Sequence, residues 1–230
     1  MNRKPKSKRI TLLQGVVHVA GWLPLGLLIY RFFTDQLGVN PIQAIEQKTG
    51  LLALTFLLLS LACTPVSSIF GWKELTQRRK ALGNYGFLYA GVHLLTFVGL
   101  DYGFKISTIL RDVGTKWYIL IGLTAFLLLL PLAVTSFNYW MKRMGKNWKR
   151  LHKLVYIISP LVVVHFFLAA KGDLFRLQGN IGQPLLYGGI ALLLLILRIS
   201  PIKTALISFR RKLAEKLPFK ARRSQGAASQ

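Results

Sequence analysis

Two histidines of this sequence lie deep inside long apolar segments, where they could together bind a metal. Membrane helices normally exclude ionisable side chains, so each one retained suggests a function. His93 lies 11 residues past Leu82, roughly 16 Å into its segment, and His165 lies 14 residues past Leu151, roughly 21 Å into its own. Imidazoles at similar depth on neighbouring helices could supply both axial ligands of a haem iron. The alternative is a pair of buried histidines hydrogen-bonded to hydroxyls or carbonyls.

A third histidine, His152, lies 13 residues before His165 in the same segment, which is roughly 20 Å along a helix. It could bind a second haem near one membrane face, or it could be an ordinary interfacial residue. A facing ligand on the segment of His93 would fall at Lys80 or Arg79, and neither side chain is an iron ligand. Histidines alone therefore leave a second haem incomplete.

The remaining histidine, His18, lies in the first apolar segment, about 12 Å in if that segment begins at Ile10. It could be the missing ligand, line a quinone pocket, or be a satisfied core histidine. The single cysteine, Cys63, is expected to be a packing residue. Because no CxxCH motif is present, a haem would be held without a covalent link.

Basic residues gather at the ends of two apolar segments and could bind anionic groups. Arg78 and Arg79 precede the segment of His93, and Lys149 and Arg150 precede that of His165. Such side chains could pair with haem propionates or with a flavin phosphate. The positive-inside rule of membrane topology explains the same residues without any ligand.

The elements that must position these residues are membrane helices, since 53% of the 230 residues are hydrophobic and 17% are charged. The net charge of +24 is carried by tails and short loops between apolar runs, which is typical of membrane topology and not of nucleic-acid binding. We predict an all-α, six-span transmembrane bundle. The spans are expected at about residues 10–33, 51–70, 81–100, 117–137, 151–170 and 185–200, between basic tails at 1–9 and 202–230, so that the membrane domain covers 10–201.

The distribution of positive charge predicts the orientation of the bundle. Of the 31 Lys and Arg residues, 24 fall in the two tails and in the loops after the second and fourth spans. Only 7 fall on the other side. Cytoplasmic loops carry such an excess, so both termini are expected in the cytoplasm.

With these features the chain resembles the ferric-reductase-like transmembrane family, and within it the haem-binding subunits of bacterial protein-methionine-sulfoxide reductase systems. The matching features are VVHVAGWLP in the first span, RRKALG before His93, GKNWKRLHKLVY at the start of the fifth span, and His165 deeper in that span. The resemblance rests on the order of these pieces in a six-span chain.

The resemblance implies a b-type haem held by His93 and His165, with His152 implicated as well, and an associated FMN. It also implies a multi-pass protein of the bacterial inner membrane that does not itself catalyse the reaction on the substrate. Electrons would pass from the quinone pool to MsrP, a periplasmic molybdopterin-containing catalytic subunit that forms a heterodimer with it and reduces methionine sulfoxide in oxidised proteins. Larger relatives have paired histidines on both helices, whereas this chain has Arg79 and Lys80.

Two other functions compete with electron transfer. A transporter could use intramembrane histidines as a proton relay, and a visible absorption spectrum would separate it from a haem protein. A self-contained ferric or superoxide-generating reductase would need a nicotinamide-oxidising domain of on the order of 100 residues. Only 29 residues follow Pro201, so that domain is not expected here.

Overall fold

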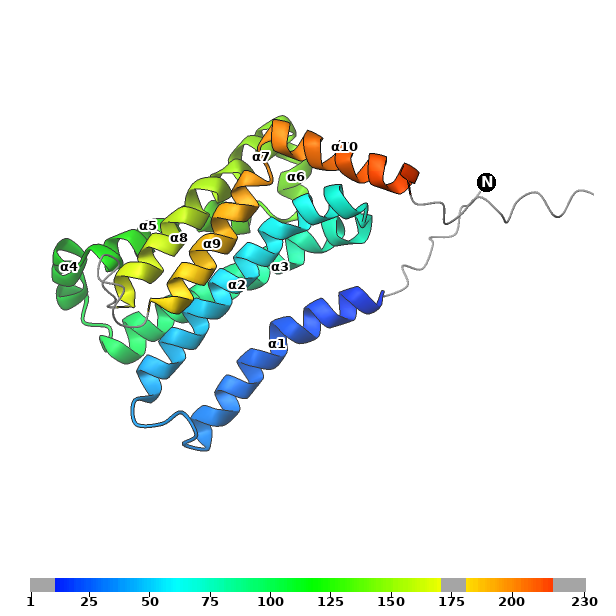
Figure 1. Ribbon diagram of the computed structural model, residues 1–230. Coiled ribbons are helices and arrows are strands. Elements are labelled where there is room, and N and C mark those ends of the chain that lie inside the picture. The colour runs from blue at the N-terminus through cyan, green and yellow to red at the C-terminus, as the bar shows by residue number, and fades with distance from the viewer. Residues whose placement is uncertain (1–10, 171–180, 217–230) are drawn as a thin grey trace, which may run out of the picture.

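The computed structural model describes residues 11–170 and 181–216, with side chains described as far as Arg210. The prediction of an all-α membrane bundle is confirmed: this part of the chain is helical and contains no strand (Figure 1). Its main helices are α1 Leu12–Phe33, α2 Pro41–Phe70, α3 Lys73–Leu95, α5 Trp117–Val134, α8 Val155–Ala169 and α9 Gly182–Ile196. The expected tail at 1–9 and most of the link between the last two spans lie outside the described residues.

The first two helices form a hairpin whose turn is shorter than the sequence predicted. The hydroxyl of Thr11 caps α1 by accepting from the backbone N–H of Gln14. Helix α2 begins at Pro41, behind an Asn40 cap, so it takes in about ten residues that we expected to be loop. Proline is favoured in the first helical turn, where its missing N–H has no partner to lose. The helix ends at Gly71, whose φ of +74° is the left-handed geometry that glycine adopts without strain.

Helix α3 also extends beyond its predicted span, because it begins at Lys73 inside the expected basic loop. Beyond Leu95 it continues as a wider π-helical turn, η1 Thr96–Asp101. Such turns are rare, and they occur frequently at functional sites. Here the turn begins three residues after His93.

Short helices fill the remaining links. Helix α4, Ile106–Thr115, lies between the third and fourth spans. Helices α6, Asn138–Met144, and α7, Lys146–Leu151, occupy the basic loop after α5. A single 3-10 turn, η2 His152–Leu154, then leads into α8, so the expected fifth span is not one continuous α-helix.

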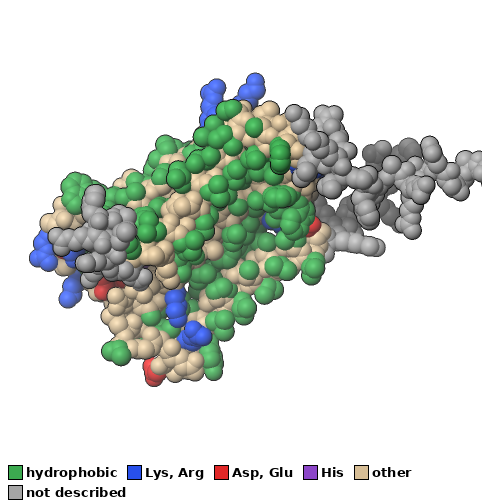
Figure 2. Space-filling model, viewed as in Figure 1, with side chains coloured by type: hydrophobic (Ala, Val, Ile, Leu, Met, Phe, Trp, Pro, Cys, Tyr) green, Lys and Arg blue, Asp and Glu red, His purple; other side chains and the backbone are tan. Residues whose placement is uncertain are grey.

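The last span is bent. Helix α9 is followed by α10, Ser200–Lys216, at an angle of 82°. Within the described residues, five helical segments are long and apolar enough to cross a membrane, and the bent pair gives a sixth. Hydrophobic side chains cover most of the face shown in Figure 2, while Lys and Arg lie toward the ends of the bundle. This is the surface of a multi-pass membrane protein.

Helices α2 and α3 pack closely at the centre of the bundle. A Cβ placed on Gly86 would lie 3.2 Å from the backbone N of Leu57, so glycine lets the two backbones approach. One buried core cluster joins α2 with α5, α8 and α9 around Leu54, Leu61 and Ile158. A second joins α1, α2 and α3, and α1 lies at the edge of the bundle (Figure 1).

Candidate functional site

The bundle brings His93 of α3 and His165 of α8 together, as their matched depth predicted. The centres of their imidazole rings lie 6.2 Å apart, and the ring planes meet at 78°. Both side chains are partly buried among the spans.

The same kind of hydrogen bond orients each imidazole. Nδ1 of His93 lies 3.0 Å from the carbonyl oxygen of Glu46, and Nδ1 of His165 lies 2.7 Å from the carbonyl oxygen of Tyr118. A carbonyl can only accept, so Nδ1 must carry the proton in both rings. The lone pair of Nε2 is thereby left free in each ring, which is the form that binds a metal.

Two glycines that we did not anticipate make room for the rings. A Cβ on Gly122 of α5 would lie 2.7 Å from Cε1 and Nδ1 of His165, and a Cβ on Gly50 of α2 would lie 3.3 Å from the same atoms of His93. Two glycines of α3 near His93 have other surroundings. Gly86 packs against α2, and Gly91 has open space around its Cα. The room beside the rings thus comes from glycines of α2 and α5, and not from these two glycines of α3.

His152 lies away from this pair, where α5, α7 and α8 meet. Its Nε2 is 3.2 Å from the hydroxyl of Thr135, and its ring lies against Trp148 with the ring centres 4.1 Å apart. Trp148 donates to the carbonyl of Thr135, which ties the three residues into one cluster. Among the described residues no second histidine faces His152. The nearby charged group is Arg79, as the sequence spacing indicated.

A second arginine, Arg198, joins Arg79 in this half of the bundle. It lies just after α9, donates to the hydroxyl of Tyr156 at 2.7 Å, and places its guanidinium 5.2 Å from the centre of that ring. It also donates to the carbonyl of Leu61 at 2.5 Å. Residue 65 is proline and has no N–H to bond this carbonyl, so the helix leaves it for Arg198.

The charges of Arg79 and Arg198 are close enough to act on one another. Within the described part of the chain, neither arginine forms a salt bridge to a carboxylate. The Nε of Arg198 is buried there without a hydrogen-bond partner. Both arginines are partly buried, and two positive charges held close together without a carboxylate partner favour an anionic ligand. Sequence reasoning missed Arg198, although an arginine at the end of an apolar span is a signal for it.

Two other predicted residues take different places. Arg150 is exposed on α7, in the short basic helix that precedes His152. Cys63 is buried in α2, and its thiol donates to the carbonyl of Leu59 within the same helix. The expectation that Cys63 is a packing residue agrees with this position.

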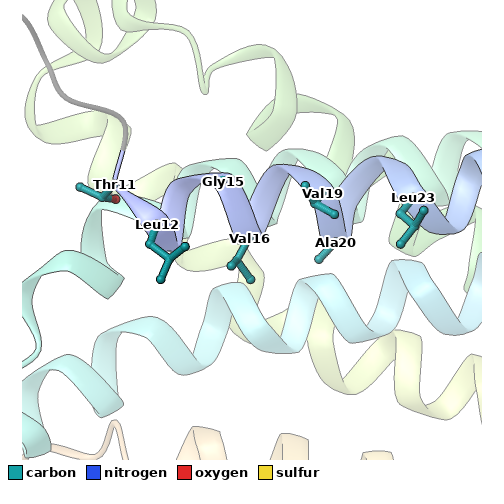
Figure 3. Close-up of a pocket in the computed structure, with 7 residues that line it drawn as sticks. All are labelled: Thr11, Leu12, Gly15, Val16, Val19, Ala20 and Leu23. Atoms are coloured by element: carbon teal, nitrogen blue, oxygen red, sulfur yellow. The ribbon is translucent and has the colours of Figure 1, made fainter.

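His18 is neither near the histidine pair nor buried. It is exposed on α1, and its Nδ1 lies 2.8 Å from the hydroxyl of Tyr85 on α3. An open hollow of about 610 Å³ runs along the neighbouring face of α1 (Figure 3). Its lining is apolar except for one threonine: Thr11, Leu12, Gly15, Val16, Val19, Ala20 and Leu23.

Comparisons with known proteins agree with this architecture. The family model described as "Ferric reductase like transmembrane component" matches residues 49–163, which include most of α2, all of α3 and α5, and most of α8. The chain therefore belongs to the ferric-reductase-like transmembrane family.

Three relatives of the chain carry the same description. The protein-methionine-sulfoxide reductase heme-binding subunit MsrQ of Herminiimonas arsenicoxydans is 38% identical over 200 residues, covering 86% of this chain and 89% of the relative. The MsrQ of Xanthomonas campestris pv. campestris strain 8004 is 40% identical over 84% of this chain and 88% of its own length. The MsrQ of Caulobacter vibrioides is 37% identical over 86% and 91%. No solved structure matches the chain.

Proposed function

We propose that this protein is the membrane electron-transfer subunit of a protein-methionine-sulfoxide reductase and that it holds one b-type haem between His93 and His165. The observation that carries the proposal is the paired geometry of these imidazoles, each with a protonated Nδ1 and a free Nε2. The names of the relatives support a haem as the bound group.

The separation of the rings fits a metal between them. A ligating imidazole nitrogen lies about 2 Å from its metal and about 1 Å from the centre of its own ring. The centres of the His93 and His165 rings are 6.2 Å apart, a separation that leaves room for one metal ion to bind a nitrogen of each ring. When bound, the haem iron would accept and release one electron at a time. The protein's contribution is to fix both rings through the carbonyls of Glu46 and Tyr118 and to keep the surroundings apolar.

We propose that FMN, and not a second haem, binds in the half of the bundle that contains Arg79, His152 and Arg198. Arg79 lies 14 residues before His93, roughly 21 Å along α3, so a group bound there is separate from the haem. Arg79 and Arg198 offer two guanidinium groups to a phosphate. The ring of Tyr156, beside Arg198, and the ring of His152 are near enough to the arginines to border a flat ligand. Arg150, which the sequence suggested, is replaced by Arg198 in this proposal.

The flavin assignment predicts an effect that is confined to one cofactor. Replacing Arg198 with Gln should lower the bound FMN severalfold or more, because a phosphate loses a charge-assisted partner. Haem content should stay at the wild-type value, since Arg198 lies far from His93 along the bundle. Flavin fluorescence and the haem spectrum of the same purified sample measure both. Arg150→Gln is the matched control, and equal flavin loss in both variants would contradict the proposed site.

We propose that electrons enter from the quinone pool and leave toward MsrP, a periplasmic molybdopterin-containing subunit that reduces methionine sulfoxide. Both termini are then cytoplasmic, in the inner membrane. The expected docking surface includes the link from Asp101 to Lys116, whose polar groups are ordered. Hydrogen bonds donated by Lys116 and Tyr102 lower the pKa of Asp112, so this carboxylate stays ionised to lower pH than an ordinary aspartate. A charged link of this kind favours transient, salt-sensitive docking.

The division of labour can be tested with purified components. The subunit alone, supplied with quinol or reduced flavin, should show haem reduction and no turnover of methionine sulfoxide. Addition of the molybdopterin partner should reoxidise the haem and start turnover, because catalysis needs a cofactor that the short extramembrane helices described here have no room to hold. Visible spectra follow the haem, and mass spectrometry of an oxidised protein follows the sulfoxide. Sulfoxide reduction by the subunit alone would refute the proposal.

A further inference from the structure

We propose that His18 and Tyr85 form a binding site for a lipid-soluble hydroquinone, and that His18 accepts the protons released when the hydroquinone is oxidised. The inference rests on the proposed electron-transfer function, because it locates the entry point of the electrons. It is carried by the place of His18 in the fold and by the residues that connect His18 to His93.

His18 is an ionisable side chain on the exposed surface of a membrane helix. It lies seven residues past Thr11, roughly 10 Å along α1, between the exposed apolar residues Val16 and Val19. Residues of this kind in the membrane mark sites for substrates, ions or protons. A core histidine that only stabilises the fold would be buried and not presented at the lipid-facing surface.

A single contact holds the imidazole of His18 against α3. Nδ1 lies 2.8 Å from the hydroxyl of Tyr85, and the Tyr85 ring packs flat against Gly21, where a Cβ has no space. When Nδ1–H donates to Tyr85, Nε2 is left as an acceptor. No hydrogen bond from the described residues occupies Nε2, so it can accept from the hydroxyl group of a bound hydroquinone.

The open hollow along α1 lies next to His18, which borders it without lining it. Gly15, three residues before it, and Val19, directly after it, both belong to the lining shown in Figure 3. A hydroquinone of the membrane has a polar ring and a long apolar tail. The ring can meet the imidazole while the tail lies in this apolar groove, so one ligand matches both features.

A continuous row of aromatic residues leads from this site to the haem ligands. Tyr85, Tyr89 and His93 are four residues apart in turn, so they share one face of α3. Phe56 of α2 bridges the two tyrosines, with its ring centre 5.6 Å from Tyr85 and 5.5 Å from Tyr89, and it is stacked on Tyr89. Tyr89 is fully buried and donates to the carbonyl of Gly21. Electrons have a packed path of roughly 12 Å along α3 from Tyr85 to His93.

The chemistry balances with groups already assigned. Oxidation of one hydroquinone breaks its two O–H bonds and releases two electrons and two protons, leaving the quinone. The two electrons would be taken up one at a time by the haem that His93 and His165 would hold, and passed on to the partner. Each proton passes to Nε2 of His18, and the resulting imidazolium releases it to water before the next transfer.

The test separates proton acceptance from a structural role. His18→Gln keeps a side chain able to bond Tyr85 but removes the proton-accepting nitrogen. We expect hydroquinone-driven haem reduction, followed by stopped-flow absorbance in vesicles, to slow by about a hundredfold. Haem content, and reduction by dithionite, should match the wild type. Leu27→Ala, at an exposed position of α1 outside the groove, is the matched control and should reduce at the wild-type rate.

A binding measurement that needs no haem completes the test. A photoreactive quinone should crosslink to peptides of α1 or α3 in the wild type and in the His93→Ala variant, and the His18→Gln variant should crosslink less. If His18→Gln fails to fold, Tyr85→Phe takes its place and should slow reduction severalfold. Wild-type rates in the folded variants, or crosslinks confined to other helices, would overturn this site alone. A wild-type protein that hydroquinone cannot reduce, while reduced flavin can, would overturn both the site and the proposed quinone donor.

Discussion

Alanine at either His93 or His165 is expected to abolish the low-spin haem spectrum of the purified protein. Each imidazole would supply one of the two axial nitrogens, so neither can be lost without leaving the iron on a single ligand. The two rings come from different helices, α3 and α8, and are fixed by different carbonyls. Equal losses of haem in these two variants would therefore show that His93 and His165 bind the same haem. Pyridine haemochrome analysis and the reduced-minus-oxidised spectrum measure haem content and spin state.

The control for this experiment is His152→Ala. His152 contacts Trp148 and Thr135 and faces no second histidine among the described residues. We therefore expect this variant to keep the wild-type haem stoichiometry and to alter FMN binding at most. Full haem retention in both the His93→Ala and His165→Ala proteins would remove the central proposal. Loss of haem in the His152→Ala protein alone would move the haem to the other half of the bundle.

Gly122→Ala is expected to lower haem affinity by roughly 10–100-fold, the usual cost of disturbing a group that orients a metal ligand. The added methyl would lie 2.7 Å from Cε1 and Nδ1 of His165. The ring cannot move away freely, because Nδ1 is held by the carbonyl of Tyr118 at 2.7 Å. Titration of the haem-free protein with haem, followed by absorbance, gives the affinity directly.

Gly91→Ala provides a matched comparison for this substitution. Gly91 is also a glycine of a membrane helix, two residues from His93, but a Cβ there meets nothing within 4 Å. Gly91→Ala should therefore leave haem binding unaltered. It also controls for the general effect of replacing a glycine of a membrane helix with alanine. Equal affinities for the two variants would show that the ring of His165 does not depend on the space beside Gly122.

Much of the helical architecture could be predicted from hydropathy, because an apolar run about as long as a bilayer is thick has few other structures open to it. The residues at which the helices begin and end were harder to predict. The segment from Pro41 to Gly50 contains Glu46 and Lys48 and was expected to be a loop, yet it forms the first part of α2. Capping by Asn40 and Pro41 was a signal for that helix, but the charged residues masked it.

The site was predictable in part, for a similar reason. Depth along a helix follows from residue counting, so the amino-acid sequence alone is enough to match His93 with His165. Contacts between helices do not follow from counting. Gly50 and Gly122 lie on helices other than those of the histidines they accommodate, and Arg198 reaches a carbonyl that Pro65 exposes 137 positions earlier in the chain. Such pairings depend on which helices become neighbours.

The bond between Arg198 and Leu61 also bears on how the chain is assembled during synthesis. An arginine at the centre of a membrane helix costs about 2.5–3.5 kcal/mol when the helix enters the bilayer from the translocon, and less near the helix end. Arg198 follows α9, the last of the apolar helices, while its acceptor is made much earlier, in α2. The carbonyl of Leu61, which Pro65 leaves unbonded, and the hydroxyl of Tyr156 thus provide hydrogen-bond acceptors for Arg198 when the last span inserts. Biogenesis of the sixth span is in this way tied to the earlier arrival of the second and the fifth.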